Sequence, residues 1–598
     1  MIKKKGSKEE KGNPIVNVLK TEWKYLGNRK KIFITFLFLF TIAGILGLMT
    51  PLIIGLIFNS IQESVMSETQ FKKLVILMSL LFVIDVGFWA FHGTARILEE
   101  RTGFFVRRNY INRKVNQVLE LPIKWHKDHH SGDTIDKINR ASGAIESFSN
   151  SFTFQIVYAI INIFGSLIIL FFVDFKIALF ALIFSLTVLY IIMKFDKKLR
   201  TYYKELNVYS NKVSSALFDY ISNIFTVITL RLKKTVAKEI DDRVMASQET
   251  NKKAVVLNEI KWGFGDIAIS LMTVSVLIFK AYTDYSAEGL IMIGTLYILY
   301  GYLERAGGTF QRFAQIYGDI VRYDARLVGA SSIDEEFEKI KEEVKERLPP
   351  NWEKIELKNF DFKYDQEGEK KHLNKVNLTF KRGQKIALIG ESGSGKSTIL
   401  SLMRGLYPPD NGEVYCDGEK LLHGPARLKH HITLIPQDPE IFNNTIKYNI
   451  TMDLKVKKEH MEKAIEMAQF EKVVGRLEKG LNTNVLEKGV SLSGGEKQRL
   501  ALARGILAAR KSEIMLLDEP TSSVDSLNEM KIYDDLFRVF RKKTIISSVH
   551  RLHLLKRFDY IYIFDKGKIV GEGTLEEIKK NPKFRIVWEK YGMTKEIK

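Results

Sequence analysis

The stretch KIALIGESGSGKST, from Lys385 to Thr398, decides the fold of the second half of the chain. Residues 386–389 are apolar enough for a buried strand, and an apolar helix pattern follows Thr398. The loop between them fits the pattern G-x-x-x-x-G-K-[ST], and it lies between a strand and a helix, as that pattern requires. This context predicts a phosphate-binding loop rather than a merely flexible glycine turn.

The residue types in this loop suit the phosphates of a nucleotide. Glycines let backbone N–H groups wrap the phosphate oxygens, and the helix N-terminus faces their negative charge. We expect Lys396 to reach the β- and γ-phosphates and the Ser397 hydroxyl to bind Mg²⁺. The residues expected to bind the nucleotide here are Gly390, Glu391, Ser392, Gly393, Ser394, Gly395, Lys396, Ser397 and Thr398.

A second apolar strand is predicted at residues 513–517, and it ends in Asp518 and Glu519. In an open α/β sheet, ligands bind at the carboxyl ends of the strands, so this acidic pair is expected beside the phosphate loop. We expect Asp518 to hold Mg²⁺ through water and Glu519 to polarise the attacking water. Two exposed carboxylates in a turn would explain the pair alone, but the glycine loop argues against that reading.

The first half of the chain has a different character. At 598 residues the chain exceeds a single hydrophobic core, and its long apolar runs stop at about Thr309. A helix needs about 20 apolar residues to cross a hydrocarbon core of roughly 30 Å. Six crossings are predicted, of which the last two are weaker: Ile32–Gln62, Leu74–Ala95, Ser151–Val173, Ile177–Met193, Ile267–Phe279 and Leu290–Leu303. A very tight turn at 174–176 joins the third crossing to the fourth.

The formal net charge of +21 is unevenly placed. Lysine and arginine gather at the N-terminus and in two long loops between apolar segments, 96–140 and 194–261. This is the positive-inside pattern of a multi-pass membrane protein, so we expect both termini in the cytoplasm and no nucleic-acid partner. The two loops lack linker composition and are predicted to be helices that continue out of the membrane and return. The single cysteine, Cys416, cannot form an intrachain disulfide.

The domain boundary is expected within a charged stretch. Asp334–Arg347 reads as a solvated helix that Pro349 and Pro350 end. We therefore predict a transmembrane domain at 1–330, a linker at 331–352 and a nucleotide-binding domain at 353–598. Within the nucleotide-binding domain, a mostly helical insert is expected at about 444–479. A hairpin is expected at 560–570, with its turn at Asp565-Lys566-Gly567.

A further motif identifies the family of the second half. LSGGEKQR at 492–499, followed by DEPT at 518–521, resembles the signature of ABC transporter ATPases. The six crossings before it resemble the exporter branch of that family, as do Leu121-Pro122 and Ser131-Gly132-Asp133 near its first coupling helix. Two departures are small: Glu496 stands where Gln is commoner, and 486–489 read LEKG where GERG is usual.

The resemblance implies roles for residues outside the two apolar strands. Tyr364 corresponds to the aromatic residue that stacks on adenine, and Gln437 to the residue that touches Mg²⁺ and senses the membrane domain. His550 corresponds to the histidine that contacts the γ-phosphate. The signature residues Ser493, Gly494 and Gly495 would complete the site of a second subunit.

The expected fold is an all-α six-helix transmembrane domain plus an α/β P-loop ATPase domain with a helical subdomain. The resemblance implies ATP-driven export or flipping of a lipid, drug or peptide across the cell membrane, with ATP and Mg²⁺ as cofactors and a homodimer that works by alternating access. An ATP-gated channel, or one half of a heterodimer, stays open as an alternative. Asp85 and Asp266 lie in or beside the crossings, where a charge marks a pathway or, as we favour, caps or pairs within the bundle.

Overall fold

A computed structural model describes residues 13–62, 68–129, 131–340, 346–364, 371–438, 440–485 and 492–585. The chain divides into two compact units. The first comprises Met1–Glu120 with His130–Lys339, and the second Leu121–His129 with Ile340–Lys598. The short segment 121–129 therefore belongs with the C-terminal residues.

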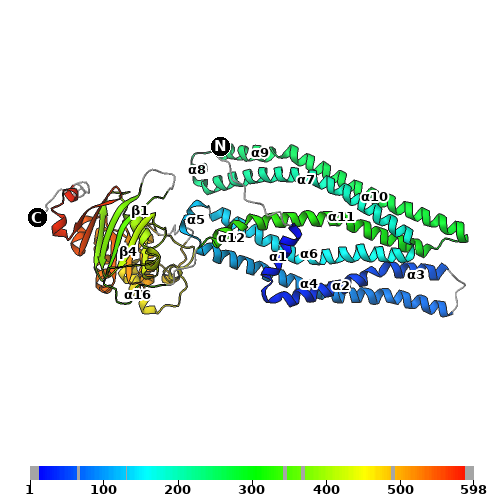
Figure 1. The fold of residues 1–598 in the computed structure, drawn as a ribbon, viewed down its shortest axis with the longest axis horizontal. Helices are drawn as coiled ribbons and strands as arrows, with labels where there is room; N and C mark the ends of the chain where they lie inside the picture. Colours follow the sequence, from blue (N-terminus) through cyan, green and yellow to red (C-terminus); the bar gives the residue numbers. More distant parts are fainter. Residues whose placement is uncertain are drawn as a thin grey trace. The chain divides into compact units, whose positions relative to one another are not determined.

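The first unit is helical throughout its described residues (Figure 1). Most of its helices are long and apolar. A helix suits a spanning segment because it satisfies its backbone hydrogen bonds internally. They are α1 (Pro14–Tyr25), α2 (Lys30–Leu48), α3 (Thr50–Gln62), α4 (Glu68–Glu120), α6 (Ser131–Val173), α7 (Phe175–Ser222), α8 (Ile224–Thr229), α9 (Lys233–Met245), α10 (Gln248–Glu288), α11 (Ile293–Gly329) and α12 (Ser331–Glu338).

Five helical segments are long and apolar enough to cross a membrane, by length and composition. They are Gly27–Gln62, Glu68–Glu120, Thr153–Val173, Phe175–Ser222 and Lys233–Ala287. Four of the first five predicted crossings lie wholly within these segments, and the third, predicted from Ser151, overlaps the segment that begins at Thr153. Helix α11 is not among the segments that this criterion selects within the described residues. The sixth crossing stays a prediction.

The predicted tight turn after Val173 is confirmed. Asp174 is the N-cap of α7, and its Oδ1 accepts hydrogen bonds from the backbone N–H groups of Lys176 at 2.9 Å and Ile177 at 3.2 Å. An aspartate in this position satisfies donors that a helix start leaves unpaired. One carboxylate thus allows the chain to reverse between α6 and α7.

Both long loops are helical, as predicted. Helix α4 continues to Glu120 and α6 begins at Ser131, whereas α7 continues to Ser222 and α8, α9 and α10 return the chain. Asp85 on α4 and Asp266 on α10 are exposed on the single chain.

The predicted helix at Asp334–Arg347 is wrong in its extent. Helix α12 ends at Glu338, and residues 341–345 lie outside the described part of the chain. What holds α12 is tertiary: the Lys114 ammonium, only 1% exposed, donates to the Ala330 carbonyl at 3.1 Å and pairs with Asp334. The helix is therefore fixed at its first turn rather than by its charged run.

The second unit contains two sheets. One has four antiparallel strands in the order β2-β1-β4-β5, and the other has six in the order β10-β9-β3-β8-β7-β6. In the six-stranded sheet all neighbours are parallel except β9 and β10. The strands are β1 (Lys354–Phe362), β2 (Leu373–Lys381), β3 (Lys385–Gly390), β4 (Asn411–Cys416), β5 (Glu419–Lys420), β6 (Ile432–Ile435), β7 (Ile514–Asp518), β8 (Thr544–Ser548), β9 (Tyr560–Asp565) and β10 (Lys568–Gly573).

The central strands are buried on both faces, which explains their unbroken apolar sequences. Along β3, Ala387 and Ile389 pack in one core, whereas Ile386 and Leu388 pack in the other. The first core also contains the predicted helical insert. The helices of this unit are α5 (Ile123–Asp128), α13 (Lys396–Met403), α14 (Pro425–Leu428), α15 (Ile446–Thr451), α16 (Lys458–Met467), α17 (Glu471–Gly475), α18 (Gly494–Ala509), α19 (Ser526–Val539) and α20 (Leu575–Ile578).

The predicted hairpin is confirmed as β9 and β10. Lys566 and Gly567 turn the chain with φ values of 46° and 78°. Two successive residues with positive φ match the right-handed twist of the strands they join. A Cβ on Gly567 would lie 2.7 Å from the His372 carbonyl oxygen, so a side chain does not fit there.

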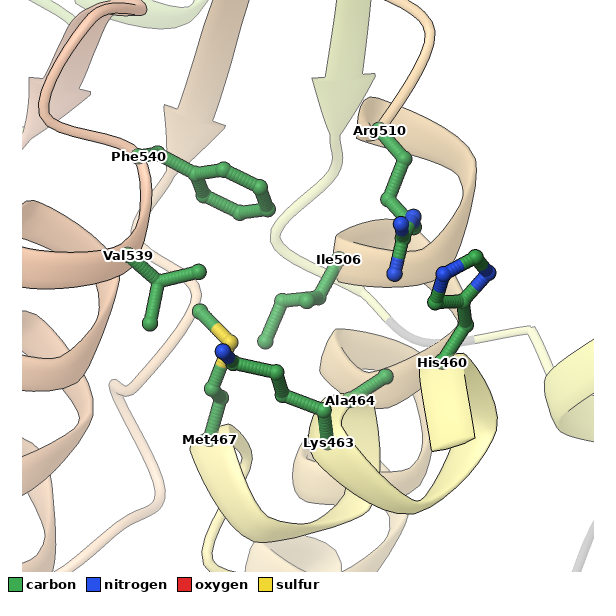
Figure 2. A pocket seen from close by; sticks show the side chains of 8 residues that line it. All are labelled: His460, Lys463, Ala464, Met467, Ile506, Arg510, Val539 and Phe540. Atoms are coloured by element: carbon green, nitrogen blue, oxygen red, sulfur yellow. The ribbon is translucent and has the colours of Figure 1, made fainter. Parts of the chain in front are cut away.

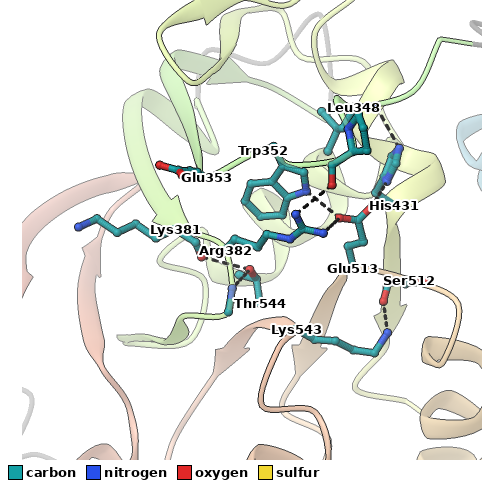
Figure 3. Close-up of polar contacts among 12 residues, drawn as sticks. Leu348, Trp352, Glu353, Lys381, Arg382, His431, Ser512, Glu513, Lys543 and Thr544 are labelled. Atoms are coloured by element: carbon teal, nitrogen blue, oxygen red, sulfur yellow. Dashed lines mark hydrogen bonds and ion pairs between the residues drawn. The ribbon is translucent and has the colours of Figure 1, made fainter.

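The residues just before β1 belong to a polar network around Glu513 (Figure 3). The Glu513 carboxylate accepts hydrogen bonds from Trp352 Nε1 at 2.9 Å, from Arg382 at 3.1 Å and from His431 Nδ1 at 2.8 Å. His431 Nε2 in turn accepts from the Leu348 backbone N–H at 3.1 Å. The segment before β1 is thereby fixed to the starting ends of β6 and β7, away from the strand ends where ligands bind.

Candidate functional site

The phosphate loop follows β3 and precedes α13, as the sequence predicts. Gly390, Gly393 and Gly395 have φ values of 147°, 78° and 112°. A Cβ on Gly390 would lie 2.2 Å from the Phe564 carbonyl oxygen, and one on Gly395 would lie 2.8 Å from Leu373. The backbone of this loop therefore requires glycine for both conformation and space.

Lys396 is buried within the loop. It is 4% exposed, and its ammonium donates to the carbonyl oxygens of Gly390 at 2.8 Å and Glu391 at 3.0 Å. Burial lowers the pKa of Lys396, and the charges of Glu519 and Asp518 oppose that shift. The ammonium is thus held beside the acidic pair that ends β7.

Asp518, at the end of β7, connects the start of α13 to the end of β8. Its Oδ1 accepts hydrogen bonds from Ser397 Oγ at 2.9 Å and from Ser548 Oγ at 2.8 Å. Strand β8 lies between β3 and β7, so Ser548 at its end lies between the phosphate loop and the acidic pair. Burial raises the pKa of Asp518, and the two hydroxyls oppose this. Sequence analysis missed Ser548, because nothing local marks a serine after a buried strand.

Glu519 is contacted by two of the residues that the signature resemblance selects. Gln437 Nε2 donates to its Oε2 at 2.7 Å, and His550 Nε2 pairs with its Oε1. The backbone N–H of Glu519 donates to Ser548 Oγ at 2.9 Å. Glu519 also has φ 47°, a left-handed conformation that is uncommon for a residue with a side chain and is typical of functional sites.

The signature begins α18. Ser493 is the N-cap, and it forms a capping box in which Ser493 Oγ accepts from the Glu496 N–H and the Glu496 carboxylate accepts from the Ser493 N–H. Glu496 also pairs with Arg476. Burial alone would raise the pKa of Glu496, but the Ser493 N–H and the Arg476 charge hold it below its usual value. Glu496, which stands where Gln is commoner, therefore adds an ion pair with Arg476 of the helical subdomain. The other departure, at 486–489, lies outside the described residues.

Gln498 connects the signature helix to the loop after the acidic pair. Its Nε2 donates to Ser522 Oγ at 2.7 Å, and its Oε1 accepts from the Ser523 N–H at 2.8 Å. A Cβ on Gly495 would lie 2.6 Å from the Ser523 carbonyl oxygen, so the two segments approach closely. The start of α18 and the loop after Glu519 are thereby held in direct contact.

Tyr364 lies in an aromatic cluster. Its ring contacts those of Phe362, His372 and Tyr407 edge-on, with centroids 4.8, 4.9 and 5.1 Å away. Tyr364 is 36% exposed, which leaves surface for a ligand.

Helix α5 supplies a cation to the same cluster. The Lys127 ammonium lies 5.6 Å from the Tyr364 centroid and 5.4 Å from that of Tyr407, within cation–π range. The Tyr407 hydroxyl raises the pKa of Lys127. Neither Lys127 nor Tyr407 was predicted from the sequence. Neither belongs to a motif, and Lys127 is far from Tyr364 in the chain.

The chain matches the models of two protein families. The model of the ABC transporter transmembrane region matches residues 33–302, and that of the ABC transporter ATPase matches residues 373–522. This chain is an ABC transporter. The transporter carries both domains in one polypeptide, so it is an ATP-binding, ATP-hydrolysing, multi-pass membrane protein of the exporter type.

Relatives of this ABC transporter cover nearly its full length. An export ATP-binding/permease protein of Rickettsia typhi is 25% identical over 541 residues, which cover 89% of this chain and 92% of that protein. A multidrug resistance ABC transporter ATP-binding/permease protein of Bacillus subtilis is 26% identical over 528 residues, covering 86% and 76% of the two chains. A solved bacterial Atm1-family ABC exporter with ATP bound has the same fold, with a TM-score of 0.81 at 20% identity over 94% of this chain and 99% of that one.

The residues of the transporter fit a magnesium ion that arrives with ATP. Among the described residues no cluster of three His, Cys, Asp or Glu side chains could hold a metal by itself. The Ser397 hydroxyl and the Asp518 carboxylate, 2.9 Å apart, are nevertheless hard oxygen donors. Mg²⁺ is commonly bound by one or two such groups together with substrate phosphates and water.

Proposed function

We propose that this ABC transporter exports or flips a hydrophobic or amphipathic substrate by alternating access of a homodimer. The observation that carries the proposal is the arrangement at Glu519, whose carboxylate is contacted by Gln437 and His550 while the adjacent Asp518 contacts the phosphate loop at Ser397. A complete hydrolytic set supports a transporter over an ATP-gated channel, which would be expected to lack one of these residues.

Each residue has a role in ATP hydrolysis. The phosphates lie on the N–H groups of the loop, with Lys396 exchanging its carbonyl partners for the β- and γ-phosphates and Tyr364 stacking on adenine. Ser397, and Asp518 through water, would hold Mg²⁺ with Gln437 beside it, and the bound ion would supply positive charge to the phosphates. Glu519 orients and accepts a proton from the attacking water, and His550 contacts the γ-phosphate.

The signature residues act on a nucleotide that is bound by the phosphate loop of another chain. In the structure Ser493 closes its own helix cap, and it offers Oγ and the N–H groups of Gly494 and Gly495 at a helix start. We assign these donors to the γ-phosphate bound by the partner subunit. Because this chain holds both the hydrolytic set and the signature, two copies make two complete sites, which favours a homodimer over one half of a heterodimer.

The orientation follows from charge. The gathering of lysine and arginine in the N-terminus and in the two long helical hairpins supports a cytoplasmic location for those segments, the ATPase domain and both termini. We propose that the transmembrane domain spans 1–330 and the nucleotide-binding domain 353–598, with a linker at 331–352. The named relatives leave lipid, drug and peptide open as substrates.

Mixed dimers test the shared site. Chains with Lys396→Ala are combined with chains with Ser493→Arg, and the nucleotide trapped by vanadate is counted per purified mixed dimer. If sites form across the interface, both lesions fall in one site, so up to one nucleotide per dimer is trapped. Each homodimer, with two damaged sites, traps none.

The matched control puts both substitutions in one chain and pairs it with an unmodified chain. Shared sites then leave both sites damaged, so trapping is lost, whereas sites built within one chain leave one site intact. Trapping in the control together with none in the first mixture would refute the shared site. Both mixtures contain the same two lesions and differ only in how these are divided between the chains.

A further inference from the structure

A cavity of about 230 Å³ lies in the second unit, away from the ATP site residues. It is bounded by α16, by the C-terminal end of α18 and by the end of α19 (Figure 2). Helix α16 contributes residues 460, 463, 464 and 467, a spacing that puts all four on one helix face. The cavity therefore joins the helical insert to the helix that carries the signature.

The floor of this cavity is apolar. Met467, Ile506 and Phe540 line it, and they are 3%, 2% and 8% exposed. All three belong to the main core of this unit, so the floor is rigidly packed. A ligand that enters can bury an apolar group here without displacing a polar one.

The rim is cationic. Figure 2 shows the Arg510 guanidinium above the His460 ring at one end and the Lys463 side chain reaching toward Met467 at the other. Within the described part of the chain, no hydrogen bond or ion pair engages these three side chains. The other charged groups nearby line the adjoining depression, where Asp535 is paired with Arg538 and Glu466 lies beside Lys463. The basic groups thus gather around an apolar floor without a counter-ion.

We propose that this cavity binds a compact amphipathic anion, an aromatic carboxylate in chemical class. The carboxylate would pair with the Arg510 guanidinium at the end beside His460, and the Lys463 charge at the other end would add attraction over a longer distance. The ring would lie on Met467, Ile506 and Phe540. The cavity is smaller than the roughly 300–1,000 Å³ of drug-sized sites, which selects a small ligand. An inorganic anion would leave the floor uncovered, and a neutral ring would leave the charges unpaired.

Binding here acts on the signature through α18. That helix starts at the Ser493 cap and ends beside Arg510, and its contacts with the loop after Glu519 run through Gln498. An anion that joins α16 to Arg510 holds the helical insert against α18. We therefore expect the ligand to change the rate of ATP turnover as well as to bind.

The test uses 2-naphthoate with the full-length transporter in lipid nanodiscs, observed by saturation-transfer NMR without nucleotide, and empty nanodiscs correct for partitioning into lipid. We expect saturable binding that weakens about tenfold or more when Lys463→Glu and Arg510→Glu are combined, because both charges that attract the carboxylate are reversed. Lys458→Glu, on the same helix but 83% exposed and outside the cavity, should leave binding unchanged. The cation 2-naphthylmethylammonium should not bind.

Equal binding by the doubly reversed variant, or equal binding of the ammonium probe, would overturn the proposal. Vanadate trapping of nucleotide by the doubly reversed variant verifies that it is folded, since neither residue lies in the ATP site. A third variant, Ala464→Leu, fills the floor without changing charge and should also weaken binding of 2-naphthoate. The binding assay needs no ATP hydrolysis, so its result does not depend on the export mechanism.

Discussion

Glu22 is the residue whose substitution should stabilise the transporter most clearly. It lies on α1, before the first spanning segment, and is 1% exposed. Within the described residues its Oε1 has no hydrogen-bond partner. Burial raises the pKa of Glu22 from its ordinary 4.5 to about 7, although the Ser149 hydroxyl opposes the shift. The folded protein thus holds this proton more tightly than the unfolded chain.

The sign and size of the effect follow from linkage. Because the folded state binds the extra proton between pH 4.5 and about 7, the free energy of unfolding falls as pH rises through that window. The difference in pKa corresponds to ~3 kcal/mol above pH 7. Glu22→Gln keeps the shape and removes the ionisation. The variant should match the parent at low pH and become more stable by up to about 3 kcal/mol at pH 8.

The assay is the apparent Tm of both proteins in the same nanodiscs at one scan rate, from pH 4.5 to pH 8. The quantity of interest is the difference in Tm at each pH, because membrane-protein unfolding is seldom reversible. Glu68→Gln is the matched control, since it makes the same substitution at a side chain that is 84% exposed. A Glu22→Gln difference that stays constant, or that falls as pH rises, would refute the reasoning.

Three further predictions concern the ATPase domain. Glu519→Gln should keep ATP binding, measured by equilibrium dialysis, and lower turnover by about 10²–10⁴-fold, because the amide cannot accept the proton of the attacking water; near-normal turnover would exclude Glu519 as the base. Tyr364→Ala should weaken ATP binding by ~1–3 kcal/mol if base stacking is lost, whereas Tyr364→Phe should retain it. Lys385→Met should lower the Tm by removing ~1–3 kcal/mol of stability. The reason is that the Lys385 ammonium donates to the carbonyls of Gly383, Phe540 and Arg541 at 3.0–3.3 Å. An unchanged Tm would show that water replaces the ammonium at these carbonyls.

The sequence determined the features that depend on neighbouring residues. The strand, glycine loop and helix at 385–403, the hairpin at 560–573 and the start of α7 at Asp174 each follow from local rules of burial, φ preference and capping. The first five crossings follow from long apolar runs. The signature at 492–499 also identified the family from residue identity alone, which the family models confirm.

Which distant residues meet depends on how the whole chain packs. Ser548 joins Asp518 because β8 lies between β3 and β7, and strand order is set by packing and crossovers rather than by local sequence. Lys127 reaches Tyr364 although more than two hundred residues separate them. The end of α12 was mispredicted because the buried contact of Lys114 with Asp334, rather than helix propensity, holds that helix. Such contacts depend on the global fold, which no local pattern of charge or hydrophobicity encodes.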